Sequence, residues 1–186
     1  LMQSLSEAKR DTRDQLAREA NPLLLAESFL AEDECWFDDE PTQTCLFRLR
    51  KWRGDYYYWL DGRYRQTLDE TVRIHLTAWL QKDVERVRAK LGVTYPITRD
   101  LVANILLNID AIIAIQETCE LNSWLDFQAR PTVIPLRNGL LSLADFDKRV
   151  APRLLGHTPN YFNTARLPLD YDPQADCPIW KCFLND

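Results

Sequence analysis

A long helix is predicted between a cap at Thr67 and a stop at Gly92, because apolar side chains recur there at close to 3.6-residue spacing. The preceding Thr67-Leu68-Asp69-Glu70 matches a capping box, in which the Thr67 hydroxyl and the Glu70 carboxylate satisfy each other's backbone donors. Gly92 is well placed to end the helix. The apolar positions of the predicted stripe are Val72, Leu76, Trp79, Leu80, Val84, Val87 and Leu91.

A second helix is predicted from the cap Thr98 to about Gln116. Apolar residues surround it almost completely, so we expect it to be the central helix of the core. Asn21 and Pro22 predict the start of a shorter buried helix, with Asn21 as N-cap and Pro22 at the first helical position. Residues 6–19 favour a helix but lack an apolar stripe, which predicts an exposed helix or a linker from an upstream module.

Between these helices the pattern becomes that of strands. Residues 45–52 and 56–59 flank the turn Arg53-Gly54-Asp55, and their aromatic enrichment predicts a hairpin. A second turn signal, Asp61-Gly62, leads to a short third strand over residues 63–65. Alternation places Phe47, Leu49 and Lys51 on one face, with Arg48, Arg50 and Trp52 on the other. The acidic residues 32–42, which include Pro41, are predicted to form a loop.

Another hairpin is predicted where residues 132–137 and 140–143 flank Asn138-Gly139, a pair that tolerates the positive φ angles of a type I′ turn. Pro135 has no backbone N–H, so its strand is expected at a sheet edge. A last helix is expected to start near Pro173 or Pro178. The predicted fold class is α+β, a single, mostly helical accessory domain with two small antiparallel β-hairpins.

Charge is segregated along the chain. The formal net charge of −5 argues against a simple basic nucleic-acid-binding domain. Residues 1–41 carry four basic and eleven acidic side chains, a net of −7. Residues 46–65 carry six basic and two acidic side chains, a net of +4, and any anionic partner is expected to meet this segment. Its basic residues are Arg48, Arg50, Lys51, Arg53, Arg63 and Arg65.

Few residues are arranged for catalysis. The sequence has no GxxxxGK[ST] phosphate-binding loop, so this chain alone is not expected to hydrolyse ATP. Structural roles are preferred over triad chemistry for His75 and His157. The cluster Asp38-Asp39-Glu40 is interpreted as a solvated acidic loop in preference to an ion site. No metal site and no bilayer-spanning segment are expected.

The chain has five cysteines, an odd number in a chain too large to need covalent cross-links. Reduced thiols in a cytoplasm are therefore predicted. Buried free cysteine is the interpretation preferred over zinc binding, because no pair has a histidine partner at suitable spacing. The residues are Cys35, Cys45, Cys119, Cys177 and Cys182.

Two interpretations of the basic, aromatic segment remain open. Its cations can neutralise phosphates while rings such as Trp52 and Tyr57 stack on bases. Alternatively, the rings pack on the helices while the cations lie in water. Both can hold on opposite faces of one hairpin. The candidate DNA-binding residues are Arg48, Arg50, Lys51, Arg53, Arg63, Arg65, Trp52 and Tyr57.

Several motifs in order resemble those of one family. The hairpin Trp52-Arg53-Gly54-Asp55-Tyr56-Tyr57-Tyr58-Trp59, followed by Asp61-Gly62-Arg63-Tyr64, is similar to a hairpin of phage and plasmid primase–helicases. Arg137-Asn138-Gly139-Leu140-Leu141-Ser142-Leu143 resembles a strand pair of the same proteins. His157-Thr158-Pro159, then Leu167-Pro168-Leu169-Asp170-Tyr171-Asp172-Pro173 and Cys177-Pro178-Ile179-Trp180, resemble their lead into the helicase motor. The resemblance is to the N-terminal helicase-associated domain of phage, plasmid and poxvirus-type primase–helicases.

This resemblance implies an accessory domain acting in DNA replication, between a primase module and a superfamily 3 AAA+ helicase that forms a hexameric ring. On this basis we expect residues 1–20 to be a linker or exposed helix, residues 21–172 the domain, and residues 173–186 the start of the connection to the helicase. The chain is thus expected to be part of a longer protein.

The expected partners are single-stranded or forked DNA, the chain's own AAA+ and primase modules, and further copies of the parent protein. No cofactor is expected in this chain, whereas ATP and Mg²⁺ are expected for the parent helicase domain. The implied location is the cytoplasm of a bacterial host, with no membrane partner. The alternative is a protein–protein oligomerisation or docking module that does not contact DNA.

Overall fold

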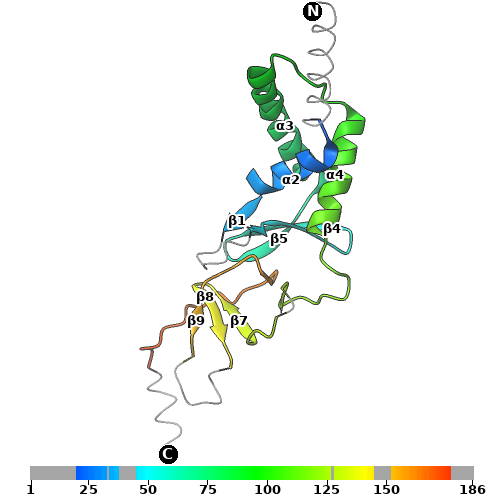
Figure 1. Cartoon of the computed structure of the whole chain (residues 1–186). Helices are drawn as coiled ribbons and strands as arrows, with labels where there is room; N and C mark the ends of the chain where they lie inside the picture. The colour runs from blue at the N-terminus through cyan, green and yellow to red at the C-terminus, as the bar shows by residue number, and fades with distance from the viewer. Residues whose placement is uncertain (1–19, 33, 38–44, 127, 145–151, 177–186) are drawn as a thin grey trace, which may run out of the picture. The chain divides into compact units, whose positions relative to one another are not determined.

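The structure, a computed structural model, describes residues 20–32, 34–37, 45–126, 128–144 and 152–176 (Figure 1). The chain divides into two compact units. The first runs through Leu60 and resumes over Tyr64–Glu120, and the second holds Asp61–Arg63 and continues from Leu121. Helices combined with small antiparallel sheets confirm the predicted α+β class.

The described elements follow in this order along the chain. The helices are α2 (Pro22–Glu32), α3 (Asp69–Leu91) and α4 (Arg99–Ile113). The strands are β1 (Cys35–Phe37), β2 (Cys45–Phe47), β3 (Leu49–Trp52), β4 (Asp55–Leu60), β5 (Arg63–Thr67), β6 (Ser123–Trp124), β7 (Val133–Leu136), β8 (Gly139–Ser142), β9 (Leu154–Leu155) and β10 (Tyr161–Phe162).

Helix α2 starts as the sequence predicts. The Asn21 side-chain oxygen accepts hydrogen bonds from the backbone N–H groups of Leu23 (2.9 Å) and Leu24 (3.4 Å), which confirms Asn21 as the N-cap. The helix buries one face against α4 within the first unit. The residues on this buried face are Leu25, Ala26, Phe29 and Leu30.

Helix α3 has the predicted stripe and stop but not the predicted start. The capping box at Thr67 is wrong, because Thr67 is still the last residue of strand β5. The N-cap is Leu68, which makes no side-chain cap hydrogen bond, and its carbonyl accepts from the N–H of Thr71 at 2.9 Å. At the other end, Gly92 has a φ of 70° and donates its N–H to the Arg88 carbonyl, as predicted.

Helix α4 begins at the predicted cap, where the Thr98 hydroxyl oxygen accepts from the Leu101 N–H at 3.1 Å. It ends at Ile113, before the predicted Gln116. Although the helix is apolar nearly all round, not every apolar side chain is buried, because Leu107 is 67% exposed. The buried residues form one stripe, Val102, Ile105, Ile109 and Ile113, and α4 packs with it on α2, α3 and β3.

The described residues of the first unit form two antiparallel sheets. Strands β3, β4 and β5 form one, with Leu49 opposite Tyr58 and Lys51 opposite Tyr56. The predicted hairpin and third strand are confirmed, except that residues 45–47 belong to β2 and pair with β1 instead of β4. Strands β1 and β2 form the other. Residues 35–37 were predicted to be loop, and this is wrong; the aromatic sequence Cys-Trp-Phe suits a strand. The cluster Asp38-Asp39-Glu40 lies outside the described residues.

The second unit contains the sheets β7–β8–β9 and β6–β10. Strand β7 is an edge strand, as predicted from Pro135. Leu136 lies opposite Gly139, so the two turn residues are Arg137 and Asn138. The predicted hairpin is therefore confirmed, but the Asn138-Gly139 turn is shifted by one residue. The small core of the second unit consists of Val133, Leu140 and Tyr161, with Trp124 and Leu155 packed against them.

Three further expectations concern the ends of the chain and membranes. Pro173 and Gln174 form a turn and not the start of a helix, and Pro178 lies outside the described residues. The exposed helix or linker predicted over residues 6–19 also lies outside them. In the described ranges, no helix is both long and apolar enough to cross a bilayer.

Candidate nucleic-acid interface

Two tight turns shape the basic segment. Arg53 and Gly54, between β3 and β4, have φ angles of 52° and 91°. Asp61 and Gly62, between β4 and β5, have φ angles of 52° and 73°. Positive φ at both central residues is what a type I′ turn requires, and its twist matches that of the flanking strands. The first of these turns places Arg53 at the tip of the β3–β4 hairpin.

The sheet β3–β4–β5 has two chemically different faces, as alternation predicted. Leu49, Tyr56 and Tyr58 lie on the face that packs on the helices and belong to the first unit's core or contact it. Trp52 and Tyr57 lie on the opposite face, where their rings meet edge to face at 6.0 Å between centroids. Burial raises the pKa of Tyr57. The packing of Tyr56 and Tyr58 agrees with the interpretation that rings pack on the helices, whereas contact of Trp52 and Tyr57 with bases stays a prediction.

Arg53, Trp52 and Tyr57 form the first cluster of candidate residues. The Arg53 guanidinium is exposed and lies over the Trp52 ring, 4.3 Å from its centroid. Trp52 itself is only 8% exposed, and its indole N–H donates to the Cys119 carbonyl at 3.1 Å. Burial and this hydrogen bond therefore fix the position of the indole, which contacts both Arg53 and the half-buried Tyr57. Cys119 is a buried free cysteine, as predicted for it.

Lys51 lies on the helix-facing side of the sheet and forms an ion pair within the protein. Its ammonium nitrogen is 2.6 Å from a carboxylate oxygen of Asp110 on α4. The other carboxylate oxygen accepts from the Tyr56 hydroxyl. Burial, followed by the hydrogen bond to Asp110, raises the pKa of Tyr56. The backbone joins the same elements, because the Ile115 N–H donates to the Lys51 carbonyl at 2.8 Å.

The remaining four cations differ in exposure. Arg48 and Arg50 are half-buried and lie over the rings of Tyr58 (4.9 Å) and Phe47 (5.5 Å). Arg50 also hydrogen-bonds with Tyr64, although burial is the larger effect and raises the Tyr64 pKa to about 12. Arg63 is half-buried and belongs to the second unit. Arg65 is exposed on β5. Among the candidates, the exposed cations are therefore Arg53 and Arg65.

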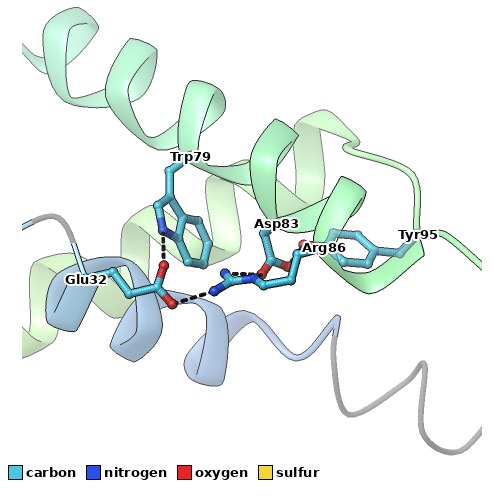
Figure 2. Close-up of polar contacts among 5 residues, drawn as sticks. All are labelled: Glu32, Trp79, Asp83, Arg86 and Tyr95. Carbon is cyan, nitrogen blue, oxygen red and sulfur yellow. Dashed lines mark hydrogen bonds and ion pairs between the residues drawn. The ribbon is translucent and has the colours of Figure 1, made fainter. Parts of the chain in front are cut away.

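A polar network that the sequence did not predict holds the helices behind this sheet. Figure 2 shows the Arg86 guanidinium between two carboxylates, Glu32 of α2 (2.8 Å) and Asp83 of its own helix α3 (2.5 Å). Glu32 also accepts from the Trp79 indole N–H at 3.0 Å, and Asp83 from the Tyr95 hydroxyl at 2.6 Å. The hydrogen bond from Arg86 is the main cause that lowers the pKa of Glu32.

In the second unit, an extended segment over residues 167–171 runs beside the edge of β7. The Leu167 N–H donates to the Pro135 carbonyl, and the Arg137 N–H to the Leu169 carbonyl, both at 2.9 Å. The Asn138 side chain makes two 2.9 Å hydrogen bonds with the backbone of Tyr171. Arg137 and Asp170 form a bidentate ion pair. We call residues 167–171 the edge strap.

The described residues also form a pocket of about 220 Å³ in the first unit. Its walls come from α2, β3, β4, β5 and α3, and from Glu34, which follows α2. Arg65 and His75 line it. Sequence reasoning assigned His75 a structural role and Glu34 to an acidic loop. No local sequence pattern could have predicted that Glu34 and His75 line one pocket, because they are 41 positions apart in the sequence.

The comparisons with known proteins agree with the motifs. Residues 47–186 match the family model described as D5 N terminal like. A search of curated proteins gives no match. The matched range covers most of the chain, including the β3–β5 sheet, helices α3 and α4, and the described second unit. The chain therefore belongs to the D5 N-terminal-like family, the N-terminal domain of D5-like primase–helicases, whose context is DNA replication.

Proposed function

We propose that this chain is an accessory domain of a phage- or plasmid-type primase–helicase that links the primase module to a hexameric superfamily 3 AAA+ helicase. In this proposal it guides single-stranded or forked DNA, in the cytoplasm of a bacterial host. ATP and Mg²⁺ would be bound by the helicase module. The family match supports the replication context, and the chemistry of the β3–β5 sheet supports the contact with DNA.

The observation that carries the DNA contact is the cluster at the tip of the first hairpin. Exposed Arg53 lies over the ring of buried Trp52, and Tyr57 packs against the same indole. A guanidinium held on a ring is pre-organised to meet a phosphate, and a neighbouring tyrosine offers a surface on which a base can stack. The segment around this cluster carries a net charge of +4 in an otherwise acidic chain.

Fluorescence anisotropy with labelled single-stranded, forked and blunt duplex DNA tests this function. The double variant Arg53→Glu/Arg65→Glu reverses the charge of the two exposed candidate cations. We expect it to weaken binding of single-stranded DNA by about ten-fold or more. The slope of log K against log salt should fall by about 0.7 for each phosphate that the variant no longer neutralises.

The matched control is Lys82→Glu/Arg88→Glu, which makes the same change in net charge on exposed positions of α3. We expect this control to keep most of the affinity, because its two residues lie outside the proposed interface. If only the net charge mattered, both double variants would lose affinity equally. Equal decreases in affinity for the two double variants, or no DNA binding by the unmodified chain, would contradict the proposed interface.

A protein–protein role is the second candidate, and exposed apolar side chains favour it. Leu68, the N-cap of α3, and Ile74 in its second turn are 74% and 58% exposed, so both offer apolar surface to a partner. Size-exclusion chromatography with light scattering tests it. A stable oligomer without DNA binding supports the oligomerisation role, whereas a monomer that binds forked DNA supports the DNA-guiding role.

A further inference from the structure

The pocket in the first unit has an apolar floor. Phe29 of α2, Leu49 of β3 and Val72 of α3 line it, and all three side chains are buried. The Tyr58 ring, half-buried on β4, forms one side. An apolar lining suits an aromatic ring system, because burial of the ring away from water stabilises it there.

One wall of the pocket is Glu34, a buried acidic residue. Glu34 is 4% exposed, and backbone hydrogen bonds fix its position on both sides. Its N–H donates to the Leu30 carbonyl at 3.3 Å, and its carbonyl accepts from the Arg48 N–H at 2.8 Å. A carboxylate accepts several hydrogen bonds and donates none, so Glu34 favours an occupant that presents N–H groups.

Polar groups surround the mouth of the pocket. Arg65 and His75 are exposed, and the half-buried Thr71 adds a hydroxyl. Arg65 carries five N–H donors in a planar fork, which suits a phosphate oxygen even when one donor is used elsewhere. The pocket therefore combines an apolar floor, a carboxylate wall and a cationic mouth.

We infer that this pocket takes one unpaired nucleobase bearing an amino group, with the adjoining phosphate beside Arg65. The base ring would lie against Tyr58 and the apolar floor, and its amino N–H would donate to Glu34. Carboxylates accept from the exocyclic amine of cytosine in the same way. This inference rests on the proposed DNA contact and adds a preference for a base class to it.

The size of the pocket fits this occupant. Its 220 Å³ is far more than the roughly 30 Å³ of one water molecule, and below the ~300–1,000 Å³ of sites for drug-sized ligands. The space suits one ring system and not a longer chain. A partner's apolar side chain also fits by volume, but the Glu34 wall and the Arg65 mouth would contribute nothing to holding it.

Equilibrium binding of two labelled oligomers of equal length, oligo(dC) and oligo(dT), tests the inference with the 186-residue chain. Cytosine offers an amino group to Glu34, whereas thymine does not. We expect oligo(dC) to bind about ten-fold more tightly than oligo(dT) at equal salt. Calorimetric titration with the mononucleotides dCMP and dTMP measures the pocket without the rest of the strand, and dCMP alone should bind.

Two variants probe the pocket by different routes. Glu34→Gln supplies a donor as well as an acceptor, so the preference for oligo(dC) should fall to about two-fold or less. Thr71→Trp fills the mouth, so it should abolish dCMP binding while single-stranded DNA still binds through the hairpin tip. The matched controls are Glu27→Gln on α2 and Ala78→Trp on α3, both at exposed positions outside the pocket lining.

The outcomes separate this inference from the proposed function. DNA binding without base preference, unchanged by Glu34→Gln and Thr71→Trp, overturns the pocket and leaves the hairpin interface standing. Binding of dCMP without affinity for any DNA strand upholds the pocket as a nucleotide site and overturns the proposed interface. Thr71→Trp altering the oligomeric state while dCMP does not bind assigns the pocket to a partner's side chain, which also overturns the inference.

Discussion

The Lys51 ammonium and the Asp110 carboxylate lie 2.6 Å apart, so the only lysine of the basic segment is bound to helix α4. Asp110 accepts from Tyr56 at the same time. The two side chains retain about a quarter of their exposure, so this contact is partly buried and water can still reach it. It joins the β3–β4 hairpin to the helix behind it.

Asp110→Ala should therefore lower the free energy of unfolding by about 1–3 kcal/mol, since Tyr56 and Lys51 are both deprived of their acceptor. Urea unfolding measures the change. Asn104→Ala, an exposed polar truncation on the same helix, serves as the control and should cost far less. Equal midpoints for the two variants would show that the contact has no net effect on stability.

Lys51→Gln should leave the salt dependence of DNA binding unchanged, because Lys51 is already paired with Asp110. Arg53→Gln, by contrast, should reduce the slope of log K against log salt by about 0.7, the value for one phosphate contact on a single strand. Anisotropy titrations at several salt concentrations measure both slopes. A reduced slope for Lys51→Gln would mean that the ion pair opens when DNA binds.

Because of Glu32, part of the free energy of unfolding should be lost at acidic pH. Its pKa is lowered in the folded chain, chiefly by the hydrogen bond from Arg86. The Glu32–Arg86 ion pair therefore contributes fully to the free energy of unfolding above the unfolded pKa of about 4.3. This contribution disappears as the pH falls through the lower pKa of the folded chain. Both side chains are about half exposed, so solvent screening keeps the effect small.

Comparison of urea midpoints at about pH 6 and about pH 3 tests this effect, since the first pH lies above the unfolded pKa of a glutamate and the second lies below it. The chain with Glu32→Gln should be destabilised less than the unmodified chain on acidification. Parallel pH profiles for the two proteins would show that Arg86 does not lower the Glu32 pKa in solution.

Tyr95→Phe should destabilise the first unit by about 1–2 kcal/mol, because it removes the hydroxyl that donates to buried Asp83. Thermal or urea unfolding measures the decrease. Tyr171→Phe is a suitable control, because Tyr171 uses its backbone and not its hydroxyl in the contacts with Asn138. A decrease of the same size in both variants would contradict a specific role for the Tyr95 hydroxyl.

Gly139→Ala should disturb the β8–β9 pairing. A Cβ at Gly139 would lie 2.5 Å from the Leu155 carbonyl oxygen, and backbone cannot move aside cheaply. Gly92→Ala meets nothing within 4 Å, so its cost is limited to the left-handed conformation, about 1–2 kcal/mol. Hydrogen exchange at Leu154 and Leu155 should rise for Gly139→Ala only. Unchanged exchange there would show that β9 tolerates the methyl group.

Local chemistry explains which elements could be predicted. Asn21, Thr98 and Gly92 satisfy helix ends with their own atoms or backbone angles, so short sequences around them carry the signal. Thr67 carries the same signal, but pairing in β5 overrides it, and pairing is a tertiary property. Asn138 misled the turn prediction for a similar reason, because its amide binds the edge strap.

The candidate interface shows the same division. Six cations and an aromatic hairpin lie within twenty positions of the sequence, and alternation assigned the faces of β3 correctly. The sequence could not show that Asp110 binds Lys51, because 59 positions separate them. The pocket was equally hidden, since Glu34, Arg65 and His75 meet only when α2, β5 and α3 pack together. Long-range packing, which depends on the whole fold, determines these contacts.

The edge strap determines how the second unit would respond to tension. Two backbone hydrogen bonds, two hydrogen bonds of the Asn138 side chain and the Arg137–Asp170 pair attach it to β7 and to the turn after β7, in the same order along both segments. A pull along β7 through residues beyond Tyr171 would load these contacts simultaneously, in shear, and not one after another. The strap would therefore resist force better than its short length indicates, which suits the proposed link to a motor.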